Sequence, residues 1–388
     1  MMNNKSLSAL VDQVRGVSYK PKDIHDTLND LSIVLLRANN IFDGSVDFSD
    51  VIYIDRKRVS PSQILRRGDI LVCASSGSKD LVGKAASFNC DGEYTFGAFC
   101  KVVRPKNVDD ADYISMFFQS PKYRREIAAS ALGANINNIR NEHIDNLIIN
   151  WPVKLNRDII VSLLNQSKSI ITLRKKQLQL FDELIKARFV EMFGDPVKNP
   201  FGLPLKKLSE LGTLDRGRSK HRPRNAPELL NGPYPLIQTG EVAASDLYIT
   251  EYHNTYSEMG LKQSKMWKAG TLCITIAANI AQTAIMSFDA CFPDSVVGFV
   301  PGDKVSALYL HYWFGFFQKI LEEQAPQVAQ KNINLKILSD LSVIVPERER
   351  LTAFEDFVTQ VDKSKVAVQK SLEQTQILFD SLMQQYFG

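Results

Sequence analysis

An internal repeat constrains the fold of this chain more than any other feature of its sequence. Arg15-Gly16-x-Ser18 near the start recurs 201 residues later as Arg216-Gly217-x-Ser219. Other short matches follow in the same order in both halves: Gly68 with Gly270, Ser87-Phe88 with Ser287-Phe288, Asn138-Ile139 with Asn332-Ile333, Pro152 with Pro346, Leu180-Phe181-Asp182 with Leu378-Phe379-Asp380, and Phe193-Gly194 with Phe387-Gly388. Because matches at a long, nearly constant period indicate a repeat architecture, we predict a tandem duplication whose halves end at Gly194 and Gly388.

Each half contains a mixed part followed by a helical part. Short β-like runs bounded by turn residues predict strands, at 31–36, 51–54 and 70–73 in the first half and at 236–238, 271–276 and 296–300 in the second. A proline, Pro152 or Pro346, then opens a stretch with helical periodicity. We therefore predict an α+β fold with an internal pseudo-two-fold repeat. The predicted fold has mixed α/β domains at residues 1–151 and 195–345, separated by long helices at 152–194 and 346–388.

Both predicted helices carry apolar residues at steps of four and three, which is typical of a coiled-coil seam. The seam residues include Leu164, Ile171, Leu178, Phe181 and Ile185 in the first helix and Val361, Val368, Leu372, Phe379 and Leu382 in the second. Each helix either packs on its own domain or pairs antiparallel with the other. We favour an antiparallel coiled coil, because the chain must leave the first helix to build the second globular part. At about 1.5 Å per residue, a helix of roughly 35 residues is on the order of 50 Å long and sets a distance.

The position of the charged residues is more informative than their total. A net charge of +4 is too small to identify a partner. The strongest local signal is a basic residue at every second position, at Arg216, Arg218, Lys220, Arg222 and Arg224. On an extended segment these side chains share one side and suit contacts with phosphate oxygens. The alternative is a solvated edge strand, since basic edge residues also deter aggregation.

Polar residues at matched places in both halves are candidate contacts to double-stranded DNA. The segment that matches the basic row carries Arg15, Ser18, Lys20 and Lys22, and Ser219 corresponds to Ser18. Asn and Gln side chains bind adenine in the major groove, and Arg and Lys side chains bind guanine. The candidate base readers are Arg37, Asn39, Asn40 and Lys84 in the first half and Gln238, Thr239 and Gln282 in the second. Because these residues differ between the halves, the pattern favours two different target sequences.

Catalytic and metal-binding motifs are missing from the sequence. The run from Gly77 to Lys84 differs from a phosphate-binding loop in spacing and lacks the Ser or Thr after the lysine. The Asn/Asp-Pro-Pro-aromatic tetrapeptide of amino-methyltransferases is absent, as are metal-ligand spacings among the five histidines. The odd number of cysteines, five, fits a reducing cytosol. With neither a signal peptide nor a membrane span in the sequence, we expect a cytoplasmic protein that is not itself an enzyme and binds no metal or cofactor.

This organisation resembles the specificity subunit of type I restriction-modification systems. The resemblance covers the whole chain and rests on the duplicated Arg-Gly-x-Ser openings, the Asn-Ile pairs, the prolines before the helices and the Phe-Gly ends. It implies two target-recognition domains that each read half of a bipartite DNA site through the major groove. The paired helices would act as a ruler across an unread spacer. Because the first unit begins almost at Met1, we expect any N-terminal segment that closes the helical bundle to be short.

The resemblance also implies partner subunits. Two methyltransferase subunits would dock on the helices, bind S-adenosylmethionine and methylate a flipped adenine. Restriction or motor subunits would use ATP and Mg²⁺. Two other classes stay open: a coiled-coil scaffold that binds proteins and has no affinity for duplex DNA, and a self-sufficient DNA-modifying enzyme, which the missing motifs disfavour.

Overall fold

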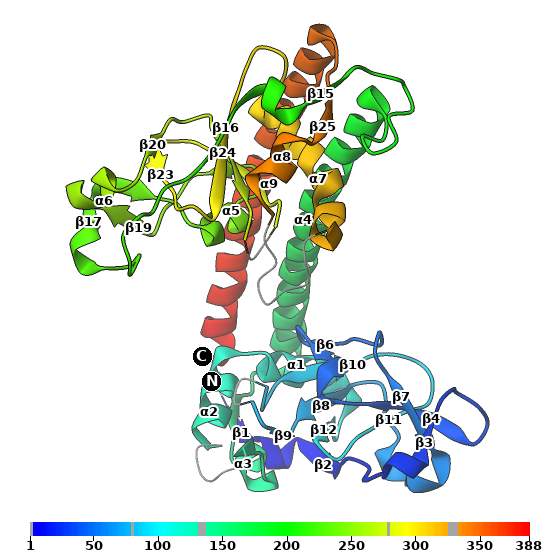
Figure 1. The fold of residues 1–388 in the computed structure, drawn as a ribbon. Helices are drawn as coiled ribbons and strands as arrows, with labels where there is room; N and C mark the ends of the chain where they lie inside the picture. The colour runs from blue at the N-terminus through cyan, green and yellow to red at the C-terminus, as the bar shows by residue number, and fades with distance from the viewer. Residues whose placement is uncertain (1–2, 79–80, 131–136, 278–279, 325–332) are drawn as a thin grey trace. The chain divides into compact units, whose positions relative to one another are not determined.

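The computed structural model describes residues 3–78, 81–130, 137–277, 280–324 and 333–388 (Figure 1). Its contacts divide the chain into two compact units: residues 1–175 with 370–388, and residues 176–369. Each unit holds one mixed α/β domain and part of each of two long helices. Asn332, which the repeat matches to Asn138, lies outside the described residues.

The domain of the first unit contains two main sheets. The six-stranded sheet has the order β2-β12-β8-β10-β6-β5, and the four-stranded sheet has the order β11-β4-β7-β3. Their strands are β2 (Val11–Arg15), β3 (Ile24–His25), β4 (Ser32–Leu36), β5 (Ile41–Phe42), β6 (Ser45–Val46), β7 (Ile52–Asp55), β8 (Asp69–Cys73), β10 (Ala85–Phe88), β11 (Tyr94–Phe96) and β12 (Cys100–Pro105). Two strand pairs, β1 (Asn4–Ser6) with β14 (Ile148–Asn150) and β9 (Ser75–Ser76) with β13 (Asn137–Asn138), and helices α1 (Ala111–Phe118), α2 (Pro121–Ser130) and α3 (Asn141–Asp145) complete it.

The domain of the second unit repeats this plan. Its five-stranded sheet has the order β16-β24-β21-β22-β18, and its four-stranded sheet has the order β19-β17-β23-β20. The strands are β16 (Gly212–Arg216), β17 (Leu230–Leu236), β18 (Tyr248–Ile249), β19 (Asn254–Tyr256), β20 (Met266–Trp267), β21 (Leu272–Thr275), β22 (Thr283–Met286), β23 (Ala290–Cys291) and β24 (Val296–Pro301), with β15 (Leu205–Lys207) paired to β25 (Ser342–Ile344). Its helices are α5 (Thr239–Ala244), α6 (Glu258–Lys262), α7 (Ala307–Gln324) and α8 (Leu335–Ser339). The shared order β2-β12-β8-β10 and β16-β24-β21-β22 confirms the predicted duplication.

Strand β8 shows why each domain has layers on both faces of its main sheet. All five of its residues are buried. Ile70 and Val72 belong to the core that includes α1, whereas Leu71 and Cys73 belong to the core against the second sheet. Because successive strand residues point to opposite faces, an unbroken apolar run requires cover on both sides. The matching strand β21 divides its residues between two cores in the same way.

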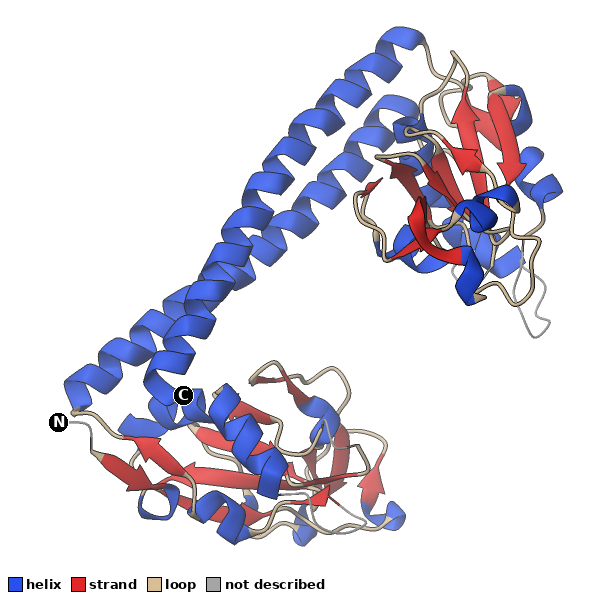
Figure 2. Cartoon of the chain, turned by 90° about the vertical axis from the view of Figure 1, so that its left-hand side faces the viewer, coloured by secondary structure: helices blue, strands red, loops and turns tan. Residues whose placement is uncertain are grey.

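The two long helices are α4 (Lys154–Phe193) and α9 (Arg348–Phe387), each of 40 residues. In the first unit, Ile160 near the start of α4 shares a core with Phe387 at the end of α9. In the second unit, Phe189 near the end of α4 packs on Phe354 near the start of α9, with 5.5 Å between ring centroids. Within each unit the helix segments therefore run antiparallel, side by side (Figure 2), which confirms the predicted pairing. The same cores include residues of the neighbouring domain, so each helix packs on its domain as well.

One match in the predicted repeat is displaced. Leu180-Phe181-Asp182 and Leu378-Phe379-Asp380 lie 198 residues apart, whereas the helix ends Phe193 and Phe387 lie 194 apart. A difference of four residues is about one helical turn. The structural equivalent of Phe379 is therefore Ile185, and both belong to the cores between the helices and the domains.

Among the described residues, no helix is both long and apolar enough to cross a membrane.

A buried lysine links β12 to the strand and helix beside it. Lys101 is 6% exposed, and its Nζ donates to Oε1 of Gln13 at 2.8 Å and to Oδ1 of Asn141 at 2.6 Å. Burial lowers the pKa of Lys101 from 10.5 to about 8, although the nearby Asp145 carboxylate opposes this shift. At a pH between these two pKa values, Lys101 holds a proton in the unfolded chain that it has lost in the folded chain. Rising pH therefore favours the folded state.

Between the two pKa values, we expect the titration of Lys101 to raise the free energy of unfolding by up to about 1.4 kcal/mol for each pH unit. Urea unfolding of the wild type and of Lys101→Met across this range checks the prediction. The difference in free energy between the two proteins should grow with pH in favour of the wild type. A difference that stays constant across this pH range would contradict the assigned titration.

Candidate nucleic-acid interface

The Arg-Gly-x-Ser motif lies at the end of equivalent strands, because β2 and β16 both end at the arginine of the motif. A Cβ at Gly16 would lie 2.1 Å from the carbonyl oxygen of Gly97, and a Cβ at Gly217 would lie 2.3 Å from the carbonyl oxygen of Phe292. Both distances are far shorter than van der Waals contact. Glycine therefore permits a close approach of two backbone segments at the same place in each domain.

The basic residues after β16 do not form the predicted extended row. The strand ends at Arg216, and the residues from Gly217 to Arg224 form an irregular loop. Pro223 has no N–H to donate to a strand ladder, and long-range contacts hold the loop: the backbone N–H groups of Lys220 and His221 both donate to Oε1 of Gln263, at 2.6 and 3.1 Å. The prediction of an extended segment is wrong, whereas contact between these side chains and DNA phosphates stays a prediction.

Two arginines of this loop share one carboxylate. Nη2 of Arg222 lies 3.5 Å from Oδ2 of Asp294, and Arg224 pairs with the other carboxylate oxygen. Nε of Arg216 donates to the carbonyl oxygen of Asp294 at 3.1 Å. Part of the positive charge is therefore balanced within the domain, by a residue about 70 positions further along the chain.

Other cations of the row remain available to an external partner. Lys220 is exposed and forms no ion pair within the described part of the chain. Arg218 lies 3.9 Å from Oδ2 of Asp215, whose closer partner is Nζ of Lys265 at 3.0 Å. Such a weakly held guanidinium can turn to a phosphate at little cost, because exposed ion pairs contribute at most about 1 kcal/mol.

Four residues predicted to contact DNA meet in one pocket of the second domain. Ser219, Arg224, Gln238 and Thr239 all line a cavity of about 230 Å³. Strand β17 ends at Leu236, two residues earlier than predicted, and Gln238 is the residue that caps α5. Asn254 also lines the cavity. Comparing the two halves of the sequence does not reveal Asn254, because it lies outside the matched segments of the repeat.

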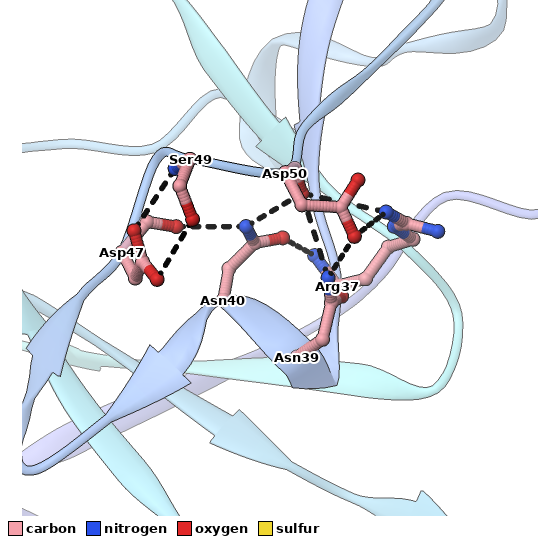
Figure 3. A network of polar contacts seen from close by, with 6 residues as sticks. All are labelled: Arg37, Asn39, Asn40, Asp47, Ser49 and Asp50. Carbon is pink, nitrogen blue, oxygen red and sulfur yellow. Dashed lines mark hydrogen bonds and ion pairs between the residues drawn. The ribbon is translucent and has the colours of Figure 1, made fainter. Parts of the chain in front are cut away.

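In the first domain, the corresponding residues Arg37, Asn39 and Asn40 form hydrogen bonds and an ion pair within their own loop (Figure 3). Asn40 is 1% exposed; its Oδ1 accepts from the backbone N–H of Arg37 at 2.8 Å, and its Nδ2 donates to the carbonyl oxygens of Asp47 and Asp50 at 2.7 and 2.9 Å. Nη2 of Arg37 lies 2.9 Å from Oδ2 of Asp50, which also accepts from Nδ2 of Asn39 at 2.6 Å. These side chains hold the loop together, and their contact with DNA stays a prediction.

The same local cap occurs in both domains. Oε2 of Glu241 accepts from the backbone N–H of Gln238 at 3.1 Å, as Asn40 does from Arg37. The remaining first-half candidates, Arg15, Ser18, Lys20 and Lys22, are all exposed and lie along the end of β2 and the segment that follows it.

Lys84 and Gln282 lie apart from these clusters, in equivalent pockets beside the long helices. Lys84 lines a cavity of about 290 Å³ in the first unit together with Arg124 and Lys168. Burial lowers the pKa of Lys168. Gln282 lines a cavity of about 300 Å³ in the second unit together with Asp182 and His311, and burial lowers the pKa of the His311 imidazole to about 4. The two matched pockets have therefore diverged in charge.

Lys365, a charged residue in the apolar seam of α9, joins the helices to the second domain. Its Nζ lies 2.7 Å from Oδ1 of Asp182 on α4 and also contacts the carboxylate of Asp246, which follows α5. Burial works to lower the pKa of Lys365, but the hydrogen bonds to both carboxylates outweigh it and raise the pKa. In the sequence, the indication of this contact is that a charged residue, Lys365, occupies a position of the apolar seam.

The described residues contain no group of three or more His, Cys, Asp or Glu side chains placed to hold a metal ion. The five cysteines are free, and four of them are buried. Burial raises the pKa of the Cys73 thiol.

The candidate interface combines basic loops, amide side chains and a polar pocket, which suit contacts with phosphates and base edges.

Comparison with known proteins identifies relatives of this chain. Residues 204–377 match the family model of the type I restriction modification DNA specificity domain. The chain is 34% identical over 180 residues to the specificity subunits of the type I restriction enzymes StySPI of Salmonella potsdam and EcoKI of Escherichia coli (strain K12). This match covers 46% of the chain and 39% of each relative. The crystal structure of a type I restriction-modification system S subunit from M. genitalium has a similar fold, with a TM-score of 0.60 and 14% identity over 100% of this chain and 96% of that one.

Proposed function

Because this chain belongs to the specificity subunits of type I restriction-modification systems, we propose that it is the non-catalytic subunit that reads a bipartite DNA target. The duplication is the observation that carries the proposal. Each unit contains a domain with the same order of four central strands, and each domain presents polar residues at the equivalent cap. Each domain would read one half of the target through the major groove.

The differences between the domains support two different half-sites. In the second domain, Gln238 and Thr239 line an open pocket. At the matched place in the first domain, Arg37 and Asn39 are tied to Asp50. Side chains of different type and setting present different donors and acceptors, and these are what distinguish base pairs in the major groove.

The length of the helices supports their proposed role as a ruler. α4 and α9 each continue for 40 residues, which corresponds to about 60 Å at the rise of an α-helix. Antiparallel packing within each unit makes a helix pair stiffer than a single helix. We propose that the pair sets the number of unread base pairs between the half-sites.

An apolar ladder on α4 supports docking of the methyltransferase subunits there. Its residues lie outside the seam with α9 and are exposed: Leu155 69%, Ile159 50%, Leu163 39%, Ile170 44% and Leu173 62% in the first unit, and Leu180 51% and Leu184 46% in the second. The equivalent positions of α9 are mostly polar residues or alanine, among them Glu349, Ser364 and Gln374. Apolar residues exposed at helical spacing indicate an interaction surface. The docked subunits would bind S-adenosylmethionine, and restriction subunits would bind ATP and Mg²⁺.

Ile170→Glu should weaken assembly with the methyltransferase subunits about tenfold or more, because it places an unpaired charge in an apolar contact. Ser364→Glu makes the same charge at the equivalent, exposed position of α9 and serves as the matched control. Titration of each variant with the subunits, followed by sedimentation, measures the effect. Equal assembly of both variants would contradict docking on the ladder.

A methyl-transfer assay tests the proposed function. The purified chain should transfer no methyl group from S-adenosylmethionine to DNA by itself and should support adenine methylation when methyltransferase subunits are added. Methyl transfer by the chain alone would contradict the role of a non-catalytic subunit. Failure to bind duplex DNA in the assembled complex would favour a protein-binding scaffold.

A further inference from the structure

The cavity of about 230 Å³ in the second domain is formed by segments far apart in the chain. Ser219 and Arg224 come from the loop after β16, Gln238 and Thr239 from the start of α5, and Asn254 from the start of β19. Leu236 and Tyr256, which are buried, add apolar lining. The cavity thus combines hydroxyl, amide and guanidinium groups with a small apolar surface.

One hydroxyl in this cavity has no hydrogen-bond partner among the residues that the structure describes. Ser219 is 5% exposed, and its Oγ is buried without a hydrogen bond. Native proteins leave few buried polar groups unpaired, so a ligand that supplies the missing partner would explain this one. Across the cavity, the side chains of Thr239 and Asn254 also form no hydrogen bond with any described residue. Three polar side chains are therefore available to one ligand.

The backbone around Ser219 is fixed before any ligand binds. The N–H group of Lys220 donates to Oε1 of Gln263 at 2.6 Å, and Oγ of Ser264 donates to the carbonyl oxygen of Arg218 at 2.9 Å. Such bonds preorganise the loop on each side of Ser219, and preorganisation lowers the cost of binding.

The chemistry of the cavity favours a base edge over a free anion. Among the described residues that line it, Arg224 is the only cation, and that charge is paired with Asp294. A base edge offers donors and acceptors together, and the amides of Gln238 and Asn254 match the donor and acceptor pattern of adenine. Arg218 and Lys220, which flank Ser219 in the chain, are exposed and suit the neighbouring phosphates.

We propose that this cavity reads one base pair of the half-site bound by the second domain, with adenine as the preferred base. Asn254 and Thr239 are specificity-determining residues beside Gln238, and Ser219 Oγ gains its hydrogen-bond partner from the DNA. The inference rests on the proposed function, because it names the contact through which one recognition domain discriminates sequences.

Asn254→Asp provides the test in the full chain assembled with methyltransferase subunits. A carboxylate accepts from cytosine N4 but does not donate to adenine N7. Methylated sites in a random DNA library should therefore shift from adenine to cytosine at one position of one half-site, by about tenfold or more. Thr239→Val should weaken discrimination at the same or an adjacent position. Asn231→Asp is the matched control. Asn231 is exposed in the same domain and lies outside the cavity, and its replacement by Asp introduces the same charge.

Each outcome decides the proposal. Unchanged base preference in Asn254→Asp and Thr239→Val, with methylation retained, would overturn the reading role of the cavity and leave the proposed function intact. If Asn254→Asp abolishes methylation, Thr239→Val decides: altered preference in this half-site supports the proposal, and unaltered preference overturns it. A wild-type complex that methylates DNA without sequence preference would instead overturn the proposed function.

Discussion

Lengthening both long helices by four residues is expected to lengthen the unread spacer of the DNA target by about two base pairs. The insertions belong between Lys175 and Lys176 in α4 and between Gln369 and Lys370 in α9, where the contacts divide the chain into two units. Four residues add about 6 Å to a helix, and a base pair occupies about 3.4 Å of duplex. Both helices must be lengthened, because an insertion in one alone would shift its residues against their partners.

The spacer is measured by mapping methylated sites with the variant complex. The half-site sequences should not change, because neither recognition domain is altered. A four-residue insertion beside Gly202 is the matched control: this exposed glycine lies in the loop between α4 and β15, and a Cβ added to it would meet no other heavy atom within 4 Å. The control should keep the wild-type spacer. A spacer that stays unchanged in the helix variant would remove the ruler from the account.

Replacing Arg216, Arg218 and Lys220 together with alanine is expected to weaken binding to all duplexes alike. Each lost phosphate contact should reduce the slope of log K against log salt by about 0.9, so three contacts would reduce it by almost three. The effect should be uniform because phosphates carry no sequence information. Binding of specific and unrelated duplexes from 50 to 200 mM salt, the range over which several phosphate contacts change affinity by orders of magnitude, measures both quantities.

Arg222 and Arg224 provide the comparison for this triple variant. Their guanidinium groups pair with Asp294, so their replacement should change the salt slope less than replacement of Arg216, Arg218 and Lys220. Loss of affinity for particular sequences only would identify the three residues as base readers. An unchanged salt slope would show that they do not contact phosphates.

The fold was predictable where a local pattern determines it. The periodicity of apolar residues predicts the two long helices α4 and α9. The short apolar run at 70–73 predicts a strand, and in β8 its residues alternate between two cores. The repeat predicted that two domains share one sheet order. The displaced Leu-Phe-Asp match shows the limit of this reasoning, since a short motif recurs one turn out of register on a helix without losing its apolar face.

The site was less predictable because long-range contacts shape it. Alternation alone predicts an extended segment that includes Arg222 and Arg224, but Asp294 binds both from a distant part of the chain. The sequence pattern predicts Asn40 as a base reader, and the fold adds that its amide closes a loop by donating to the carbonyl oxygens of Asp47 and Asp50. Asn254 joined the candidates only when the fold brought β19 beside the loop after β16. Local pattern identifies polar residues, whereas tertiary contacts decide which of them remain free.

The most direct test of the central claim is a map of methylated adenines in cells that contain this chain and methyltransferase subunits. The account predicts one bipartite motif, with two different half-sites separated by a spacer of fixed length. Exchange of residues 195–345 for the equivalent domain of a relative should change one half-site and leave the other. A single contiguous motif, or methylation without sequence preference, would contradict the account.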